Sequence, residues 1–284
     1  MNNTSVEIFS KGLYSSWCYH SAYQSLFDCG EGCATHLANR LPGVESIWLG
    51  HDHGDHTLGL PSLIGCRNAA QGTSRNKDTM ADHNKPMNVY YPADNRLMES
   101  LLQFIDVRYN NGWLRYRLNF IPIQAGFEME IGKNTFLRAF NMKHQKDQTT
   151  LGYVIYTIRT RLKAEYKDLG SSIGQMIKSG KVRSEDISES FRANLFAYCL
   201  DAYAIPDADQ IKGCDDVIMD CTFVNSKDRT DMTHFTLDEA VDLCKNLGVK
   251  KMYAAHFSPR YDFNQTVKDR PEVQFINPYI VNKI

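Results

Sequence analysis

Three histidines and two aspartates lie within six residues, from His51 to His56, in the order His-Asp-His-Gly-Asp-His. Imidazole and carboxylate groups bind first-row divalent metals, and zinc in particular. In a protein core, so many polar groups on one turn would lack partners unless cations lay between them. A solvated, histidine-rich loop is the alternative, but the spacing His-x-His-x-Asp-His is far more specific than a lone pair of histidines. The motif therefore predicts a metal site.

The segments around the motif indicate how it is held. Ile47 to Leu49 is an apolar run typical of a buried strand, and Leu58 to Ala69 is expected to be helical. The motif would then form a turn at the edge of a sheet. Three further candidate ligands also follow predicted strands: His144 after 136–142, Asp201 after 195–200, and His256 after 251–255.

The motif resembles the signature of the metallo-β-lactamase superfamily, whose hydrolases hold one or two metals at the edge of an αββα sandwich. Two further segments narrow the resemblance to the ribonuclease Z branch, which cleaves phosphodiesters. They are Leu26 to Gly32 (Leu-Phe-Asp-Cys-Gly-Glu-Gly) and His256 to Tyr261 (His-Phe-Ser-Pro-Arg-Tyr). The resemblance covers roughly Val6 to Tyr261. It implies an α/β (α+β) fold, a four-layer αββα sandwich, with residues 1–284 in a single domain.

The resemblance also implies two divalent metals, zinc or alternatively manganese. The implied ligands are His51, His53 and His144 for one metal, Asp55, His56 and His256 for the other, and Asp201 as the bridge. Two cations lower the pKa of a bridging water, so that hydroxide exists near neutral pH, and they neutralise the phosphoryl oxygens during attack. Asp55 can also accept the proton of that water as a general base.

The resemblance also implies a catalytic role for His234, which matches the histidine that protonates the leaving group in the family. A surface histidine at the start of a helix is the alternative. The family orients this histidine with a glutamate, whereas the matching residue here is the shorter Asp220. The setting of Asp201 also departs from the family, with Leu-Asp-Ala where Gly-Asp-Thr is common. Ser258 and Arg260 are expected beside the metals, where an arginine suits an anionic phosphate better than a β-lactam or glyoxalase substrate.

Two classes of phosphodiester substrate remain open. Transfer RNA 3′-processing enzymes of this branch carry an arm between the third ligand and the bridging aspartate, and its tip is rich in glycine and proline in bacterial forms. Here the interval from His144 to Asp201 has no proline and four glycines. It is similar instead to the short forms of the family, plant-type short tRNase Z and the anti-Pycsar phosphodiesterases of phages and bacteria, which open cyclic mononucleotides and so degrade cyclic pyrimidine nucleotide signals.

The remaining sequence features divide between these classes. The segment Phe9 to Trp17 resembles the anti-Pycsar group, and a formal net charge of −1 favours a small 3′,5′-cyclic mononucleotide over a long nucleic acid. Residues 159–183 favour a tRNA precursor, because seven basic residues stand against two acidic ones, a net charge of +5. This stretch lacks the alternation of a core strand, so we expect a partly helical, basic surface insertion at about 159–190. A metal-binding module without catalysis is a third class.

The composition is that of an ordinary globular enzyme, with 43% hydrophobic and 23% charged residues. None of the eight cysteines forms a Cys-x-x-Cys pair, which favours reduced thiols over disulfides. No targeting segment or membrane-spanning run is apparent, so no membrane partner is expected. We therefore expect a cytoplasmic protein, in the host cytoplasm if it is encoded by a phage. The resemblance also implies a homodimer.

Overall fold

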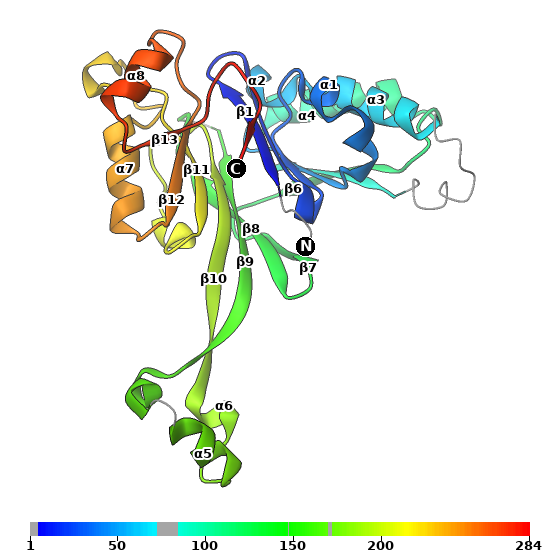
Figure 1. The fold of residues 1–284 in the computed structure, drawn as a ribbon. Coiled ribbons are helices and arrows are strands. Elements are labelled where there is room, and N and C mark those ends of the chain that lie inside the picture. Colours follow the sequence, from blue (N-terminus) through cyan, green and yellow to red (C-terminus); the bar gives the residue numbers. More distant parts are fainter. Residues whose placement is uncertain (1–4, 73–84, 147, 170–171) are drawn as a thin grey trace.

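The computed structural model describes residues 5–72, 85–146, 148–169 and 172–284. These residues form two seven-stranded sheets that pack face to face (Figure 1). The first sheet has the order β14 (Asn282–Lys283), β1 (Val6–Lys11), β2 (Ser15–His20), β3 (Ser25–Phe27), β4 (Ser46–Trp48), β5 (Met87–Pro92), β6 (Leu118–Ile123). The second has the order β13 (Gln274–Phe275), β12 (Lys251–Ala255), β11 (Asp216–Asp220), β10 (Ser188–Cys199), β9 (Thr150–Leu162), β8 (Thr135–Met142), β7 (Glu128–Gly132).

Helices cover the outer faces of both sheets. The first sheet is covered by α1 (Cys33–Leu37), α3 (Leu60–Gly72) and α4 (Arg96–Tyr109), and the second by α7 (Leu237–Asn246), with α8 (Phe263–Asp269) beside it. Three apolar clusters fill the spaces between the layers, and the middle one, around Phe27, Trp48 and Tyr153, joins the two sheets. The predicted αββα sandwich is confirmed.

Each sheet has a parallel half, and the metal motif lies at the end of one of them. Strands β3, β4, β5 and β6 run parallel to one another, as do β10, β11, β12 and β13. The carboxyl ends of parallel strands meet at one sheet edge, which is where α/β folds gather their functional side chains. The sequence Thr-Leu-Asp-Glu at 236–239 is typical of a capping box, and the box is present at the start of α7, because Thr236 accepts from the amide of Glu239, whose carboxylate accepts from the Thr236 amide.

Several predicted boundaries differ from the structure. The helix expected over 58–69 corresponds to α3, and α2 (Gly54–Thr57) lies before that range. The sequence also favours a helix over 33–40, but α1 ends at Leu37 and a 3-10 turn (Ala38–Gly43) follows it. Residues 71–85 are rich in Gly, Ser, Asn, Asp and Lys, which predicts a surface loop, but most of them lie outside the described part of the chain. Elements α8, β13 and β14 were not predicted, and β14 pairs with β1, which brings the C-terminal segment beside the N-terminal strand.

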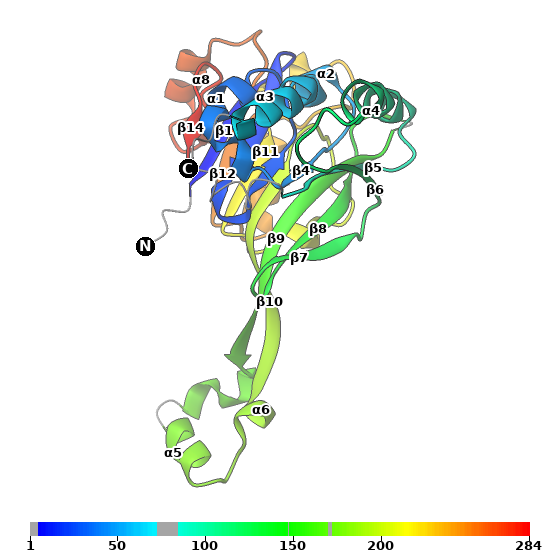
Figure 2. The ribbon, with the colours of Figure 1, turned by 90° about the vertical axis from the view of Figure 1, so that its right-hand side faces the viewer.

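The sequence favours a strand over 151–158 besides the one over 195–200. In the structure, β9 and β10 are longer than these ranges, and they project from the body as a two-stranded ribbon (Figure 2). The short helices α5 (Ser172–Lys178) and α6 (Ser184–Ile187) lie at its tip, together with a 3-10 segment (Ala164–Leu169). We call residues 159–190 the arm. The arm holds seven basic and five acidic residues, so its net charge is +2 and not the +5 of residues 159–183 alone.

Two further expectations concern the membrane and the cysteines. Within the described residues, no helix combines the length and the apolar character needed to span a bilayer. All eight cysteines are free; seven are buried and Cys66 is exposed.

Candidate metal centre

Every predicted metal ligand lies at the carboxyl end of a strand, on the edge shared by the two sheets. The segment His51 to His56 follows β4, His144 follows β8, Asp201 follows β10, and His256 follows β12. Asp201 and His256 have φ angles of 56° and 60°, in the left-handed region that side chains rarely adopt. Strained backbone of this kind is held in place only when the surrounding structure determines it, and it is concentrated at functional sites.

Two glycines allow the metal turn to lie directly on the neighbouring strands. A Cβ atom on Gly30 would lie 2.3 Å from the carbonyl oxygen of Asp55, and one on Gly59 would lie 2.1 Å from the carbonyl oxygen of Gly30. Neither position tolerates a side chain without a backbone shift. The short helix α2 is therefore fixed against the segment that follows β3, and Asp55 and His56 are fixed with it.

One group of possible ligands contains His51, His53, His144 and Asp201, whose donor atoms all lie within 4.8 Å of one another. Oδ2 of Asp201 lies 3.4 Å from Nε2 of His51, 3.9 Å from Nδ1 of His53 and 3.7 Å from Nε2 of His144. The Gln145 side chain also contacts Nε2 of His53. The structure thus brings together the side chains predicted for the first metal.

A second group contains Asp55, His56 and His256. Nε2 of His56 lies 3.4 Å from Oδ2 of Asp55, and Nε2 of His256 lies 3.2 Å from the same oxygen. The other oxygen of Asp201, Oδ1, lies 3.2 Å from Nε2 of His56 and 3.1 Å from Nε2 of His256. One carboxylate therefore points an oxygen into each group, which is the geometry of a bridging ligand.

The donor set fits divalent cations because several of its atoms have no other partner. Both ring nitrogens of His51, Nε2 of His56 and Oδ1 of Asp201 are buried and accept or donate no hydrogen bond within the described chain. Buried polar atoms without partners are rare in folded proteins, since each raises the free energy of the native state. Burial also lowers the pKa of His144 to about 4 and lowers that of His51, so both imidazoles are neutral and able to coordinate.

The far nitrogens of His56 and His144 are held by other polar groups of the chain. Nδ1 of His56 donates to Oδ2 of Asp28 at 2.6 Å, and Nδ1 of His144 donates to the carbonyl oxygen of Thr233 at 2.8 Å. Asp28 itself accepts from the Tyr198 hydroxyl and the Gly50 amide. Such partners fix the orientation and tautomer of a metal-binding histidine, and they leave Nε2 of both rings free to coordinate.

Asp220 connects the candidate ligand His256 to the predicted proton donor His234. Nδ1 of His234 donates to Oδ2 of Asp220 at 2.7 Å, and Nδ1 of His256 donates to the Thr222 hydroxyl, which donates to Oδ1 of Asp220 at 2.7 Å. The backbone amides of Ala202 and Thr222 also donate to the Asp220 carboxylate. The sequence left the pairing of the shorter acid with His234 in doubt, and the structure makes that contact.

The electrostatics of this pair suit a proton donor. Burial alone would lower the pKa of His234, but the Asp220 carboxylate outweighs it and raises this pKa to about 9. His234 is therefore protonated at neutral pH. Burial would raise the pKa of Asp55, but hydrogen bonds from His256 and His56 outweigh it and lower this pKa, so Asp55 is ionised. The ring of His234 lies 5.2 Å from that of His256 and 4.8 Å from that of His144.

The two predicted substrate-binding residues lie farther out. Ser258 is buried, and its hydroxyl accepts from the Arg260 amide at 3.5 Å. The Arg260 guanidinium lies over the Phe223 ring, 5.1 Å from its centroid, and donates to the carbonyl oxygen of Asp228. The Phe223 ring in turn lies 6.2 Å from that of His234. One aromatic ring therefore separates Arg260 from His234, so the arginine lies at the rim and not among the ligands.

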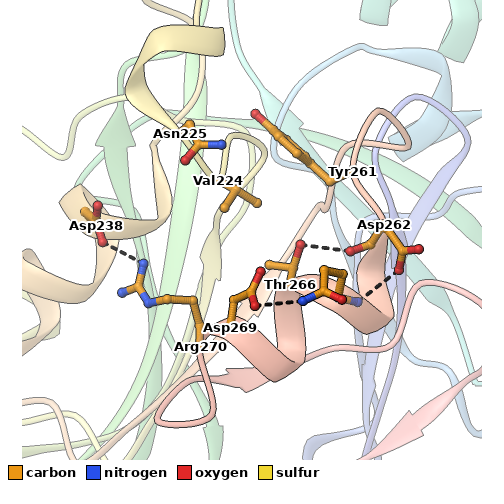
Figure 3. A pocket seen from close by; sticks show the side chains of 9 residues that line it. Val224, Asn225, Asp238, Tyr261, Asp262, Thr266, Asp269 and Arg270 are labelled. Carbon is orange, nitrogen blue, oxygen red and sulfur yellow. Dashed lines mark hydrogen bonds and ion pairs between the residues drawn. The ribbon is translucent and has the colours of Figure 1, made fainter.

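A hollow of about 350 Å³ lies next to this rim, between α8, the start of α7 and the segment that follows Phe223 (Figure 3). Asp238, Asp262 and Asp269 line it, and its cation Arg270 is paired with Asp238 at 2.7 Å (Figure 3). An excess of carboxylates repels an anionic phosphodiester. This hollow is therefore not where a phosphodiester would bind.

The sequence analysis assigned no role to Asp28 and Thr222, which hold the rings of His56 and His256. Asp28 lies directly after β3, with a φ of 55°, and Thr222 lies two residues after the end of β11. Asp28 shares the signal that identified Asp201, a carboxylate at the end of a buried strand. The local sequence gives no comparable signal for Thr222, because its role depends on the distant His256.

Comparison with known proteins supports the fold and the branch. No model of a known protein family matches the chain. The ribonuclease Z of Thermococcus kodakarensis is 26% identical over 273 residues, which cover 86% of this chain and 78% of that protein. The ribonuclease BN of Cronobacter sakazakii is 26% identical over 277 residues, which cover 89% of this chain and 84% of that protein.

Solved structures give the same result for the fold. The short form of human tRNase Z superimposes with a TM-score of 0.65 at 16% identity, covering 98% of each chain. The metallo-β-lactamase fold protein YhfI from Bacillus subtilis superimposes with a TM-score of 0.63 at 14% identity, covering 99% of this chain and all of the other. At such identities the likeness establishes the fold alone.

Proposed function

We propose that this chain, which has the metallo-β-lactamase fold and has ribonuclease Z and ribonuclease BN proteins among its homologues, is a metal-dependent hydrolase that acts as a dinuclear phosphodiesterase on 3′,5′-cyclic mononucleotides. The observation that carries the proposal is the position of Asp201, with one carboxylate oxygen facing each of two groups of nitrogen and oxygen donors. Zinc suits this mixed set best, and manganese is the alternative.

The roles of the protein groups follow from their contacts. Two bound divalent cations would supply an activated water and neutralise the phosphoryl oxygens of the substrate. Asp55 is ionised and lies within 3.4 Å of both His56 and His256, so it can orient the attacking water and accept its proton. Burial lowers the pKa of His51 and His144, while Asp28, Thr222 and the Thr233 carbonyl hold the rings of His56, His256 and His144, respectively.

The leaving alkoxide requires a proton, and His234 is the group that can supply it. Its Nδ1 is engaged by Asp220, which leaves Nε2 as the donating atom. The pKa of about 9 keeps the proton on the ring at neutral pH, while the neighbouring carboxylate stabilises the charge. After transfer, the ring is neutral and can take a proton from solvent for the next turnover.

A small cyclic substrate is favoured by the electrostatics of the arm. The arm carries a net charge of only +2, and that sum already includes the ion pair Arg161–Glu189. Its tip lies at the end of the molecule opposite α2 (Figures 1 and 2). A polyanion bound mainly through charge would require a larger basic surface.

The second candidate is removal of 3′ trailers from tRNA precursors, and two observations favour it. The curated relatives are named ribonuclease Z and ribonuclease BN. The arm also projects far enough from the body to contact a part of a large substrate remote from the metal centre (Figure 2). A homodimer belongs to either candidate by resemblance, and sedimentation equilibrium of the purified protein tests it.

The deciding experiment presents both substrate classes to the same metal-loaded protein. A panel of 3′,5′-cyclic mononucleotides and a tRNA precursor with a 3′ trailer are compared, with Asp55→Ala as the inactive control. We expect ring opening of cyclic nucleotides, pyrimidine forms included, and an intact trailer. Trailer removal without cyclic-nucleotide turnover would make the protein a tRNA maturase. No turnover of either substrate by metal-loaded protein would overturn both candidates.

A further inference from the structure

We propose that Lys11, Tyr14 and Tyr279 form a subsite that receives the nucleobase of the substrate. The inference rests on the proposed function and adds to it a place for the part of the substrate that the metal centre does not contact. None of the three residues has a role in the metal centre or in the packing of the two sheets. We call them the aromatic rim.

Two residues of the aromatic rim, Lys11 and Tyr14, lie in the turn that contacts the backbone of the candidate ligand His256. The amide of Gly12 donates to the carbonyl oxygen of Phe257 at 3.3 Å, and a Cβ atom on Gly12 would lie 3.0 Å from the carbonyl oxygen of His256. The amide of His256 donates to the Ser10 hydroxyl at 2.9 Å. The turn between β1 and β2 therefore lies directly on the strand end that positions His256 at the second metal group.

The side chains of this turn and of the C-terminal segment are exposed although they are large and apolar. Leu13 is 80% exposed and Tyr14 60%, and from the other end of the chain Tyr279 is 62% and Ile280 56% exposed. Leu13 has a φ of 72°, which is unusual for a residue other than glycine. In Figure 1 this turn and the C-terminal segment lie at the same end of the molecule as α2. An exposed apolar patch beside a reaction centre marks a binding surface.

Lys11 gives this patch its specificity for a nucleotide. Its ammonium lies 4.6 Å from the centroid of the Tyr14 ring and 5.2 Å from that of the Tyr279 ring, so it joins the two exposed tyrosines. Among the described residues, no carboxylate lies within ion-pair distance of Lys11. Exposed tyrosine rings stack on bases of any sequence, and a nearby cation attracts the phosphate or a base carbonyl.

Other exposed features of the chain lack this combination. Phe104 on α4 is as exposed as Tyr14, but it is in a helix that covers the outer face of the first sheet. The hollow beside Tyr261 is lined by carboxylates, which disfavour a nucleotide. Within the described residues, only the aromatic rim combines exposed aromatic rings and an unpaired cation with a neighbouring turn that contacts the backbone of His256. This combination fits a nucleobase better than a purely apolar partner.

The test separates base binding from catalysis. The variants Tyr14→Ala and Tyr279→Ala are compared with Tyr14→Phe and Tyr279→Phe, which keep the ring, and with Phe104→Ala, a matched exposed aromatic residue. Two substrates are used: a 3′,5′-cyclic pyrimidine mononucleotide and a base-free deoxyribose 3′,5′-cyclic phosphate. Each alanine variant should raise the KM for the nucleotide about tenfold with kcat nearly unchanged. The KM for the base-free substrate should not change, and the phenylalanine and Phe104 variants should behave as wild type.

A second readout does not require turnover. Saturation-transfer NMR on the metal-free protein should show contact to the base protons of the nucleotide in the wild type, and weaker contact in both alanine variants. An unchanged nucleotide KM in active variants, or an equal change for both substrates, would overturn the aromatic rim as a base subsite. A change of oligomeric state in the alanine variants would also overturn it, because the rim would then be a contact between two copies. If the wild type itself opens neither cyclic substrate, it is the proposed function that fails.

Discussion

The metal centre and the arm are opposite kinds of structure within one chain. At the centre, His51, His56, Asp201 and Asp220 are almost completely buried, and the far nitrogens of His56, His144 and His256 are each held by a second polar group. In the arm, the ion pair Arg161–Glu189 joins side chains that are each about half exposed, and exposed ion pairs stabilise a protein little. Function should therefore depend on the exact position of single atoms at the centre but not in the arm. Substitutions should have steep effects at the centre and small effects in the arm.

Asp201→Asn should have the largest effect. The change keeps the shape of the side chain but removes the charge that lies between the two ligand groups, so metal binding and turnover should both collapse. The loss in kcat/KM should exceed the roughly hundredfold to ten-thousandfold that a general acid contributes. Metal analysis and a hydrolysis assay on the same preparation test this, with circular dichroism as a control for folding. A variant that keeps both metals and most of its activity would remove Asp201 from the bridging position.

His234→Ala tests the proposed proton donor and should have the second-largest effect. The pKa of His234 is raised to about 9, so the protonated, donating form is present below that pH and is lost as the pH rises through it. We expect an alkaline fall in kcat near or below pH 9 in the wild type, and a loss of about a hundredfold or more in the variant at pH 7. The variant should also lack this alkaline limb. Asp220→Asn should move the limb to lower pH, and an unchanged limb in both variants would assign it to another group.

Asp28→Asn should have an intermediate effect, because it acts through His56. It weakens the acceptor that orients the ring, so the affinity for metal should fall about tenfold to a hundredfold. At saturating zinc, kcat should remain close to that of the wild type. A competition titration with a chelator measures the affinity, and Tyr198→Phe, which removes one donor to the same carboxylate, is a milder matched variant. A fall in kcat at saturating zinc, with no change in affinity, would assign Asp28 a direct role in the reaction.

Removal of the arm should have the smallest effect on a cyclic nucleotide. Ile158 and Arg192 are paired across β9 and β10, so an Asn-Gly turn can join them in place of the arm. The kcat/KM for a 3′,5′-cyclic mononucleotide should stay within about twofold of the wild type, as expected for a change at an exposed surface. A large loss would make the arm part of the functional unit and would favour the tRNA alternative.

The sequence predicted the centre better than the arm for a physical reason. The metal motif is local, with four candidate ligands in six residues, and the other candidate ligands follow runs of buried strand residues, which periodicity detects. The αββα sandwich then follows from strands that alternate with helices. In the arm, β9 leaves the core after residue 157, so its outer part has no buried face and no alternation that would identify a strand.

Contacts between distant segments were the other part that the sequence could not predict. The link from His256 through Thr222 to Asp220, and the pairing of β14 with β1, depend on packing between segments far apart in the chain. The net charge of the arm was overestimated for a related reason. The acidic residues Glu185, Asp186 and Glu189 lie outside 159–183 but return to the same ribbon in the fold.

The number of metal ions bound per chain tests the central claim most directly. Purified protein is loaded with zinc, freed of excess metal and analysed for zinc per chain, with activity measured during a stepwise titration. We expect two ions per chain in the wild type, with full activity only when both are present. His256→Ala should retain the ion held by His51, His53 and His144. Full activity with one bound ion, or with none, would contradict a dinuclear centre bridged by Asp201.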